Sequence, residues 1–491
     1  MNRFRVSFTV LFILSAFAFT VTRADQAARL KLNPCDLSNI KGARCGKYEV
    51  FEDRDARHGR KIALNVVVLP ALTDKPAPDP VFFLAGGPGQ GAAQIAKNSG
   101  ADFMQGIRRT RDVVFVDQRG TGESNFLNCD FYGDGSSLQP YFDELFPPEK
   151  LRECRQKLEK ISNPALYTTS LAIDDLDEIR RALGYEKINV WGGSYGTTAS
   201  MAYLKRYPKQ VRSVVLEGIA PLDSKLPLPF AKGAQQALDR LITDCAADET
   251  CHKAFPDFRA EFAAVIARLD KGPVSFEMTN PVTKKSERIR MSRGVFGERL
   301  RLLLYSPDLS SLVPLLVHEA YKNNFVPFAS LAQYMTRLIA DQVAQGMYFS
   351  VTCPEDTLLI TEREIARDTA NTFIGDYRVR MHIKACQQWP RGRVPADFTS
   401  VLKSDAPVLM FSGDVDPATP PEYGEAVARN FSNGRRVVIP NTPHSYGGKC
   451  INDLIEEFIS RGSASGLDVS CVNQTRRPPF MTEFPKDFIE Q

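Results

Sequence analysis

Short runs of apolar residues recur along the chain and predict buried β-strands. The runs are rich in Val, Ile and Phe, and most of them lack the alternating polar positions of a half-exposed strand. Strands that are covered on both faces have this pattern. The predicted strands are Ile62–Leu69, Val81–Leu84, Val113–Val116, Ile188–Trp191, Val211–Leu216, Pro407–Phe411 and Arg436–Ile439.

Amphipathic helical patterns lie between several of these strands. In residues 171–183, Leu176, Ile179 and Leu183 fall on one face of a helix, and Gly184 stands where a C-cap glycine is expected. Strands that alternate with helices form a mostly parallel sheet with helices on both faces. The sequence therefore predicts an α/β fold.

The alternation stops after Pro221, and the chain as far as about Asp405 has mainly helical patterns. We expect this part to be a helical cap, inserted between two strands of the sheet. The predicted division is a core of residues 25–222 and 401–491 with the cap over residues 223–400. A chain of 491 residues is long enough for such an insertion.

Residues 1–24 have the layout of a secretory signal peptide. Arg3 and Arg5 precede an uncharged, mostly apolar stretch over residues 6–22, and small residues follow, so cleavage is expected after Ala24. A retained membrane anchor is the alternative, although 17 residues interrupted by Ser and Thr are at the lower limit for a spanning helix. We expect a secreted or periplasmic protein without stable membrane insertion after cleavage.

The charge and composition are those of an ordinary soluble globular protein. Hydrophobic residues make up 43% and charged residues 24%, which excludes a disordered or collagen-like chain. The formal net charge is +4, but the first 24 residues hold three of the 62 basic and none of the 58 acidic residues, which leaves +1. A nearly neutral chain gives no reason to expect a nucleic-acid partner.

The cysteines indicate an oxidising compartment. Their number, ten, is even, none lies in residues 1–24, and none forms the CxxC pair that is common in zinc sites. Neighbours in the sequence could pair to form five disulfides, but connectivity does not follow from sequence. The cysteines are Cys35, Cys45, Cys129, Cys154, Cys245, Cys251, Cys353, Cys386, Cys450 and Cys471.

A candidate nucleophile lies in the pentad Gly192-Gly193-Ser194-Tyr195-Gly196. This G-x-S-x-G pattern follows a predicted strand and precedes a helical pattern, which is the context of a nucleophile elbow. The turn is sterically crowded, so the residues that flank the serine at the pattern's glycine positions must lack a Cβ. It leaves the Ser194 hydroxyl exposed and places the Tyr195 N–H where negative charge develops during acyl transfer.

A serine needs a base and an acid to become a nucleophile, and in this fold both follow it in the chain. Of five histidines, only His444 follows a late strand and a turn. The loop after the strand at Pro407–Phe411 offers two acids. The G-x-x-D spacing selects Asp416, and Asp414 is the second choice.

The other oxyanion donor is expected on a loop after an early strand. Residues 85–89 read Ala-Gly-Gly-Pro-Gly and follow Val81–Leu84. Because Pro88 has no N–H, Gly87 is the first choice for the donor and Gly86 the second.

Four motifs in order resemble those of the proline iminopeptidases and the secreted tripeptidyl aminopeptidases. They are Leu84-Ala-Gly-Gly-Pro-Gly89, similar to HGGPG with Ala85 in the place of His; Asp117-Gln-Arg-Gly-Thr-Gly-Glu-Ser124, similar to DQRGxGxS; Gly192-Gly-Ser-Tyr-Gly-Thr197; and Asp416-Pro-Ala-Thr-Pro420, similar to DPxTP. The match covers most of residues 46–222 and 401–460.

This resemblance implies an α/β-hydrolase fold with a helical cap, and a serine exopeptidase that acts on short peptides from a free N-terminus, of prolyl or tripeptidyl type. Ser194, Asp416 and His444 would be the catalytic residues, and Tyr195 and Gly87 the oxyanion donors. Arg119 is expected to have a structural role. The acyl-enzyme route requires no metal or other cofactor.

An aminopeptidase must also bind the ammonium group of its substrate. The related enzymes use glutamates, and here Glu217, Glu355 and Asp356 are the candidates, with ordinary surface acids as the alternative. Two other functions remain open, a secreted carboxylesterase or amidase with the same triad, and a non-catalytic binding protein on a hydrolase scaffold.

Overall fold

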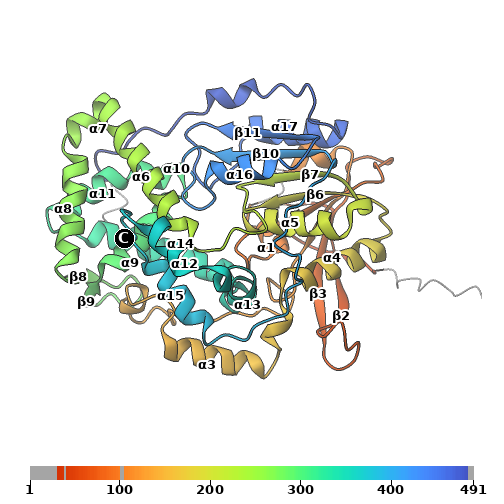
Figure 1. Ribbon diagram of the computed structural model, residues 1–491, viewed down its shortest axis with the longest axis horizontal. Coiled ribbons are helices and arrows are strands. Elements are labelled where there is room, and N and C mark those ends of the chain that lie inside the picture. Colours follow the sequence, from red (N-terminus) through yellow and green to blue (C-terminus); the bar gives the residue numbers. More distant parts are fainter. Residues whose placement is uncertain (1–29, 38–39, 100–103, 485–491) are drawn as a thin grey trace, which may run out of the picture.

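The computed structural model describes residues 30–37, 40–99 and 104–484 (Figure 1). Within these residues the main sheet has nine strands in the order β1-β2-β3-β5-β4-β6-β7-β10-β11. The strands from β5 to β11 in this order are parallel, whereas β1, β2 and β3 extend the β5 edge through antiparallel pairs. The strands are β1 (Asn33–Pro34), β2 (Arg44–Phe51), β3 (Lys61–Leu69), β4 (Val81–Leu84), β5 (Val113–Val116), β6 (Ile188–Gly193), β7 (Val211–Glu217), β10 (Val408–Gly413) and β11 (Gly434–Ile439).

The prediction of a mostly parallel α/β sheet is confirmed. Each of the seven predicted strands is present, with ends that differ by at most two residues. The predicted helix is α4 (Thr169–Leu183), and Gly184 ends it in the left-handed conformation with φ 84°. Strands β1 and β2 were not predicted, because most positions of β2 are exposed or only partly buried and its sequence has no apolar run.

The apolar runs are buried because helices cover both faces of the sheet. Phe82 and Leu84 of β4 pack in a cluster with residues of α4 and α5, whereas Val81 and Phe83 pack in a second cluster with α1 and α17. Successive side chains of a strand point to opposite faces, so every residue of β4 lies in a hydrophobic core.

The helices fall into two groups, those associated with the main sheet and those in the long segment between β7 and β10. Those packed around the main sheet or between its strands are α1 (Ala92–Ser99), α2 (Gln105–Arg108), α3 (Pro148–Glu159), α4 (Thr169–Leu183), α5 (Tyr195–Arg206), α16 (Pro421–Ala428) and α17 (Lys449–Arg461). Those between β7 and β10 are α6 (Pro229–Ala247), α7 (Glu249–Ala254), α8 (Phe258–Asp270), α9 (Arg293–Leu303), α10 (Pro307–Ser311), α11 (Val313–Tyr321), α12 (Val326–Gln342), α13 (Gln345–Glu355), α14 (Glu362–Thr369) and α15 (Tyr377–Cys386).

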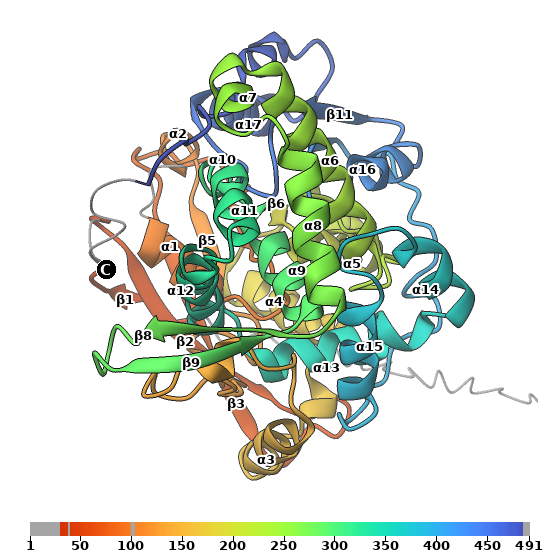
Figure 2. The same ribbon diagram turned by 90° about the vertical axis from the view of Figure 1, so that its left-hand side faces the viewer.

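The long segment between β7 and β10, called the insertion below, is mainly helical. Helices α6, α8, α9, α11 and α12 pack around a hydrophobic cluster of their own and lie to one side of the sheet in Figure 1. The insertion also contains a hairpin, β8 (Val274–Thr279) and β9 (Ser286–Met291), which was not predicted. Figure 2 shows this hairpin beside the helices of the insertion. The division into a core and a cap over residues 223–400 stays a prediction.

Helices α13 and α15 connect the insertion to the sheet. Met347 and Phe349 of α13 and Ala385 of α15 belong to the same cluster as α4 and α5. The disulfide Cys353–Cys386 joins the two helices. The last helices of the insertion are thus held against the core, close to the carboxyl ends of the parallel strands.

All ten cysteines form disulfides, and each pairs with its neighbour in the sequence. The bridges are Cys35–Cys45, Cys129–Cys154, Cys245–Cys251, Cys353–Cys386 and Cys450–Cys471. Disulfides of this number are typical of extracytoplasmic proteins. The predicted signal peptide, residues 1–24, lies outside the described residues. Among those described, no helix is both long and apolar enough to span a bilayer.

Candidate active site

Ser194 lies on a sharp turn between β6 and α5. Its backbone has φ 55° and ψ −124°, a conformation that is strained for a residue with a side chain. The turn closes tightly, since a Cβ on Gly192 would lie 2.1 Å from the carbonyl oxygen of Gly196, and one on Gly196 would lie 2.1 Å from that of Leu84. Both glycines are therefore required. This geometry is that of a nucleophile elbow.

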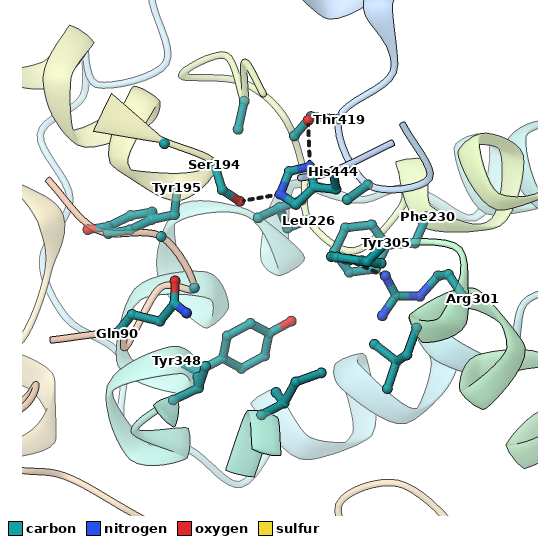
Figure 3. A pocket seen from close by; sticks show the side chains of 18 of the residues that line it. Gln90, Ser194, Tyr195, Leu226, Phe230, Arg301, Tyr305, Tyr348, Thr419 and His444 are labelled. Carbon is teal, nitrogen blue, oxygen red and sulfur yellow. Dashed lines mark hydrogen bonds between the residues drawn. The ribbon is translucent and has the colours of Figure 1, made fainter. Parts of the chain in front are cut away.

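The Ser194 hydroxyl is hydrogen-bonded to His444 (Figure 3). His444 is hydrogen-bonded in turn to Asp416. The distance from Ser194 Oγ to His444 Nε2 is 2.9 Å, and from His444 Nδ1 to Asp416 Oδ2 it is 2.7 Å. His444 follows β11 and Asp416 follows β10, so three loops at the carboxyl ends of parallel strands bring these residues together. The arrangement can remove a proton from the serine hydroxyl.

Asp416 is held ionised by its surroundings. Oδ1 accepts hydrogen bonds of 2.8 Å from the N–H groups of Ala418 and Thr419, and Oδ2 accepts others from the Thr419 and Tyr446 hydroxyls. Burial alone would raise the pKa of Asp416, but the charge and hydrogen bond of His444 and these backbone donors hold it below the ordinary value. Asp414 instead accepts from the Thr442 N–H and makes no hydrogen bond to His444.

The glycine loop after β4 lies against the nucleophile. A Cβ on Gly86 would lie 3.1 Å from the Cβ of Ser194. Gly87 has φ 108°, which favours glycine, and it lines the same cavity as Gly86 and Ser194. Both candidates for the oxyanion donor thus lie on the wall of the cavity that holds Ser194, and Tyr195, which supplies the other proposed N–H, is the first residue of α5.

Arg119 of the Asp117–Ser124 motif is fully buried. It donates two hydrogen bonds to Asp175, of 2.7 and 2.9 Å, and others to the carbonyls of Glu52 and Leu166. These contacts join the loop after β5 to α4 and to β2. Arg119 does not line the cavity at Ser194, which agrees with the expected structural role.

Ser194 and His444 open into a cavity of about 520 Å³ between the sheet and the insertion. The core contributes the loops after β4, β6, β7, β10 and β11, and the insertion contributes residues of α6, α9, α12, α13 and α15. Many of the lining side chains are aromatic or aliphatic, such as Phe146, Phe230 and Leu226. A cavity of this size accommodates a few amino-acid residues and not a folded protein.

Two family models match the chain. Residues 79–254 match the model described as alpha/beta hydrolase fold, and residues 371–471 match the one described as TAP-like protein. The chain has the α/β-hydrolase fold. The first match includes the elbow and the glycine loop, and the second includes Asp416 and His444.

Three curated relatives are similar to this chain. The serine protease Hip1 of Mycobacterium tuberculosis is 26% identical over 484 residues, which cover 89% of this chain and 90% of the relative. The tripeptidyl aminopeptidase of Streptomyces coelicolor is 23% identical over 505 residues, covering 93% and 88%. The proline iminopeptidase of Neisseria gonorrhoeae is 31% identical over 140 residues, covering 28% and 32%. These matches show a serine hydrolase of the peptidase type.

Of the three carboxylates proposed for amine binding, only Glu217 lines the cavity. It ends β7, accepts a hydrogen bond of 2.7 Å from Trp191 Nε1, and accepts another at its carbonyl from the N–H of Ser194. Burial raises the pKa of Glu217 to about 7, with the Trp191 bond opposing the shift.

Glu355 and Asp356 lie behind the lining, where the end of α13 meets the core. Glu355 accepts hydrogen bonds from the N–H and the hydroxyl of Thr169, at 2.7 and 2.6 Å. Asp356 accepts one from the hydroxyl of Ser224. Burial raises the pKa of Glu355 to about 8 and that of Asp356 to about 7. Both carboxylates are engaged with the protein itself.

A charged group on the cavity wall was not found from sequence. It consists of Glu298, Arg299 and Arg301 on α9 and Arg378 on α15. Nothing in the sequence marks these residues as partners, because the two helices are about 75 residues apart and only their packing brings the side chains together.

One group of three possible metal ligands occurs in the described residues, Cys353, His382 and Cys386. The two cysteines form a disulfide, so neither offers a thiolate. His382 is fully buried, and burial lowers its pKa well below the ordinary value. These residues do not fit a metal.

Proposed function

We propose that the protein is a serine aminopeptidase that releases one or a few residues from the free N-terminus of short peptides, of the prolyl or tripeptidyl type. The observation that carries the proposal is the hydrogen-bonded series Ser194–His444–Asp416 at the floor of a cavity roofed by the insertion. The whole-length similarity to the serine protease and to the tripeptidyl aminopeptidase supports it.

In this proposal, Ser194 Oγ attacks the carbonyl carbon of the scissile peptide bond while His444 Nε2 takes the hydroxyl proton. The tetrahedral intermediate carries a negative charge on the former carbonyl oxygen, and the N–H groups of Tyr195 and Gly87 stabilise it. His444 then donates the proton to the leaving amine, and an acyl-enzyme on Ser194 remains. Asp416 stays ionised and stabilises the imidazolium.

Water completes the reaction. His444 removes a proton from the water as it attacks the acyl carbon, and returns a proton to Ser194 Oγ when the acyl group leaves. None of these steps requires a cofactor.

Glu217 is the proposed partner of the substrate ammonium. Of the two glutamates in the cavity lining, it is the one whose backbone is bonded to the nucleophile, since its carbonyl accepts a hydrogen bond from the Ser194 N–H. A bound ammonium favours the ionised form of the carboxyl and would offset the cost of burying it. Glu355 and Asp356 are the less favoured candidates, because both are bonded to core residues.

The proposed location is outside the cytoplasm, in the periplasm or the medium, with export directed by residues 1–24. The five disulfides support it, because cytoplasmic thiols are kept reduced.

The proposal is tested with short peptide amides and the corresponding peptide esters, each with a free or an acetylated N-terminus. We expect acetylation to lower kcat/KM by about tenfold or more for the wild type, since an ionic hydrogen bond is worth about 1.5–3 kcal/mol. Glu217→Gln should lose most of this difference. Turnover of esters only, or equal turnover of free and acetylated peptides, would favour an esterase or amidase instead.

A further inference from the structure

The cavity wall opposite the glycine loop carries more positive than negative charge. Three arginines line it, Arg299, Arg301 and Arg378, and one carboxylate, Glu298, lies among them. The side chains of Arg301 and Glu298 are 3% and 2% exposed, and that of Arg378 is 12% exposed. An excess of buried positive charge is costly unless an anion compensates it.

Glu298 is shared by two of the arginines. Its Oε1 accepts hydrogen bonds from Arg301 Nη2 at 2.6 Å and from Arg378 Nη1 at 3.1 Å, and its Oε2 accepts one from Arg301 Nε at 3.1 Å. Burial alone would raise the pKa of Glu298, but the charges of Arg301 and Arg378 hold it below the ordinary value. One carboxylate thus faces two guanidinium groups, which leaves one positive charge between them. Arg299, whose guanidinium donates to the carbonyl of Tyr141, adds a second.

The two guanidinium groups also keep unused donors. Together they have ten N–H bonds, and they make five hydrogen bonds, three to Glu298 and one each to the hydroxyls of Tyr305 and Tyr348. Arg378 Nε is buried and has no hydrogen-bond partner. A buried donor without a partner is destabilising, so a ligand with acceptor oxygens would be stabilised here.

Aromatic rings hold these guanidinium groups in place. Arg301 Cζ lies 4.3 Å from the ring centroid of Phe230, and Arg378 Cζ lies 5.1 Å from that of Phe146. A planar guanidinium stacked on a ring keeps its edge free for two parallel hydrogen bonds to a carboxylate. The site is therefore organised before a ligand arrives.

One side chain, that of Tyr305, separates the arginines of this cavity wall from His444. The ring centroid of Tyr305 lies 5.1 Å from that of His444, and the Tyr305 hydroxyl accepts a hydrogen bond from Arg301 Nη1. In Figure 3, Ser194, His444, Tyr305 and Arg301 follow one another across the cavity. A residue of extended peptide spans about 3.3–3.6 Å, so a peptide bound at Ser194 reaches this wall with a group one or a few residues away.

We propose that Arg301 and Arg378 bind a carboxylate of the substrate, either an acidic side chain or the C-terminal carboxylate of a short peptide. The proposal rests on the proposed peptidase function and adds a substrate class to it. The same wall repels an ammonium group, which agrees with Glu217, and not Glu298, as the partner of the substrate amine.

The test compares three peptides of equal length that all have a free N-terminus. The first has neutral residues and an amidated C-terminus, the second has the same residues and a free C-terminal carboxylate, and the third is amidated but carries one Asp or Glu. We expect kcat/KM of the second or the third to exceed that of the first by about tenfold or more, as expected for a charged hydrogen bond. The second and third peptides distinguish the two sources of the carboxylate.

Arg378→Met should bring this ratio close to one, and Arg378→Lys, which keeps the charge but not the planar fork, should give an intermediate ratio. Arg301 still binds Glu298 through two nitrogens in these variants. Arg380→Met is the matched control on the same helix, because Arg380 pairs with Glu362 and Asp376 outside the cavity, and it should keep the wild-type ratio. Binding of the same peptides to Ser194→Ala, measured by calorimetry, gives a readout that does not depend on turnover.

The carboxylate site would be overturned if the wild type turned over peptides with and without the carboxylate at nearly equal kcat/KM. It would also be overturned if Arg378→Met left the ratio of these two values unchanged. If Arg378→Met does not fold, the ratio in Arg378→Lys and the calorimetry decide in its place. The proposed aminopeptidase function fails by a different result, equal turnover of free and acetylated N-termini, so the two failures can be told apart.

Discussion

The hydroxyl groups of Thr169 and Tyr195 lie 2.7 Å apart and join the first residues of α4 and α5. Thr169 Oγ1 also donates a hydrogen bond of 2.6 Å to Glu355 Oε2. Because Thr169 has one hydroxyl proton, Tyr195 is the donor in the first bond while Glu355 is ionised. The residue after the nucleophile is thereby anchored to the last turn of α13, and its N–H is aimed at the site of the proposed oxyanion.

Thr169→Val should weaken the oxyanion site without removing it. The substitution breaks the bonds to Tyr195 and Glu355, and we expect kcat to fall by about tenfold, which corresponds to about 1.4 kcal/mol, the scale of one lost hydrogen bond. KM should change little, because Thr169 does not line the cavity. Steady-state kinetics measures both, and Thr169→Ser should restore most of kcat. A change in KM alone would contradict a positioning role.

Asp416→Asn and Asp414→Asn test which aspartate orients the histidine. Asp416 accepts a hydrogen bond from His444 Nδ1. Asp416→Asn should therefore lower kcat by roughly 10⁴-fold, as in other enzymes with this triad. Asp414 pairs with Arg240 at 3.6 Å and accepts from Thr442, so its substitution should cost less than about fivefold. Comparable losses in the two variants would mean that the acid is misassigned.

The amine preference should depend on pH through Glu217. Its pKa is about 7, so the carboxylate that would bind the ammonium disappears as the pH falls below 7. We expect the KM ratio of acetylated to free peptide to shrink between pH 8 and pH 5, by up to about tenfold per pH unit. The ratio cancels effects that both substrates share. In Glu217→Gln it should be small and independent of pH; a pH-independent ratio in the wild type would rule out Glu217.

The raised pKa of Glu217 also makes the free energy of unfolding depend on pH. The folded-state pKa of Glu217 lies above the value of 4.5 for an exposed glutamate, so its contribution is fully present below pH 4.5 and is lost as the pH rises through 7. Glu217→Gln should therefore gain stability relative to the wild type above pH 7, which urea unfolding at pH 6 and pH 9 can measure. A relative loss at pH 9 would show that the carboxylate is stabilised there by a partner.

The disulfides should contribute unequally to stability. Cys353–Cys386 closes a sequence separation of 33 residues and joins α13 to α15, whereas Cys245–Cys251 closes six. From loop entropy, replacing the first pair by alanine should cost about 3–4 kcal/mol and the second about 2 kcal/mol. Urea unfolding of the two double variants measures the difference. Equal costs would show that packing and not loop closure determines the effect.

The fold and the proposed catalytic residues could be predicted because their signals are local. A buried parallel strand is an apolar run, and the strand–turn–helix around Ser194 needs glycines at fixed positions. The order of nucleophile, acid and base follows the order of the strands. Strand β2 has no apolar run and was not predicted. The hairpin β8–β9, where about half the side chains face solvent, was not predicted either.

Of the residues proposed to bind the substrate, Glu217 was among the candidates named from the sequence, but the others could not be predicted, because they depend on packing between helices. Glu355 and Asp356 are neighbours in sequence, yet α13 directs them to Thr169 and Ser224 instead of the cavity. Glu298 and Arg378 lie 80 residues apart and meet only because α9 and α15 pack together. Helix orientation, which no local pattern specifies, decides which carboxylates and guanidinium groups face the substrate.

The central claim is that Ser194 is the nucleophile of a peptidase that recognises a free amine. It is tested most directly with a pair of peptidyl diphenyl phosphonates, one with a free N-terminus and one acetylated, whose sites of attachment are mapped by mass spectrometry. We predict one phosphonyl group on Ser194, attached at least about tenfold faster from the free compound, and none on Ser194→Ala. Equal rates for the two compounds, or modification at another residue, would contradict the account.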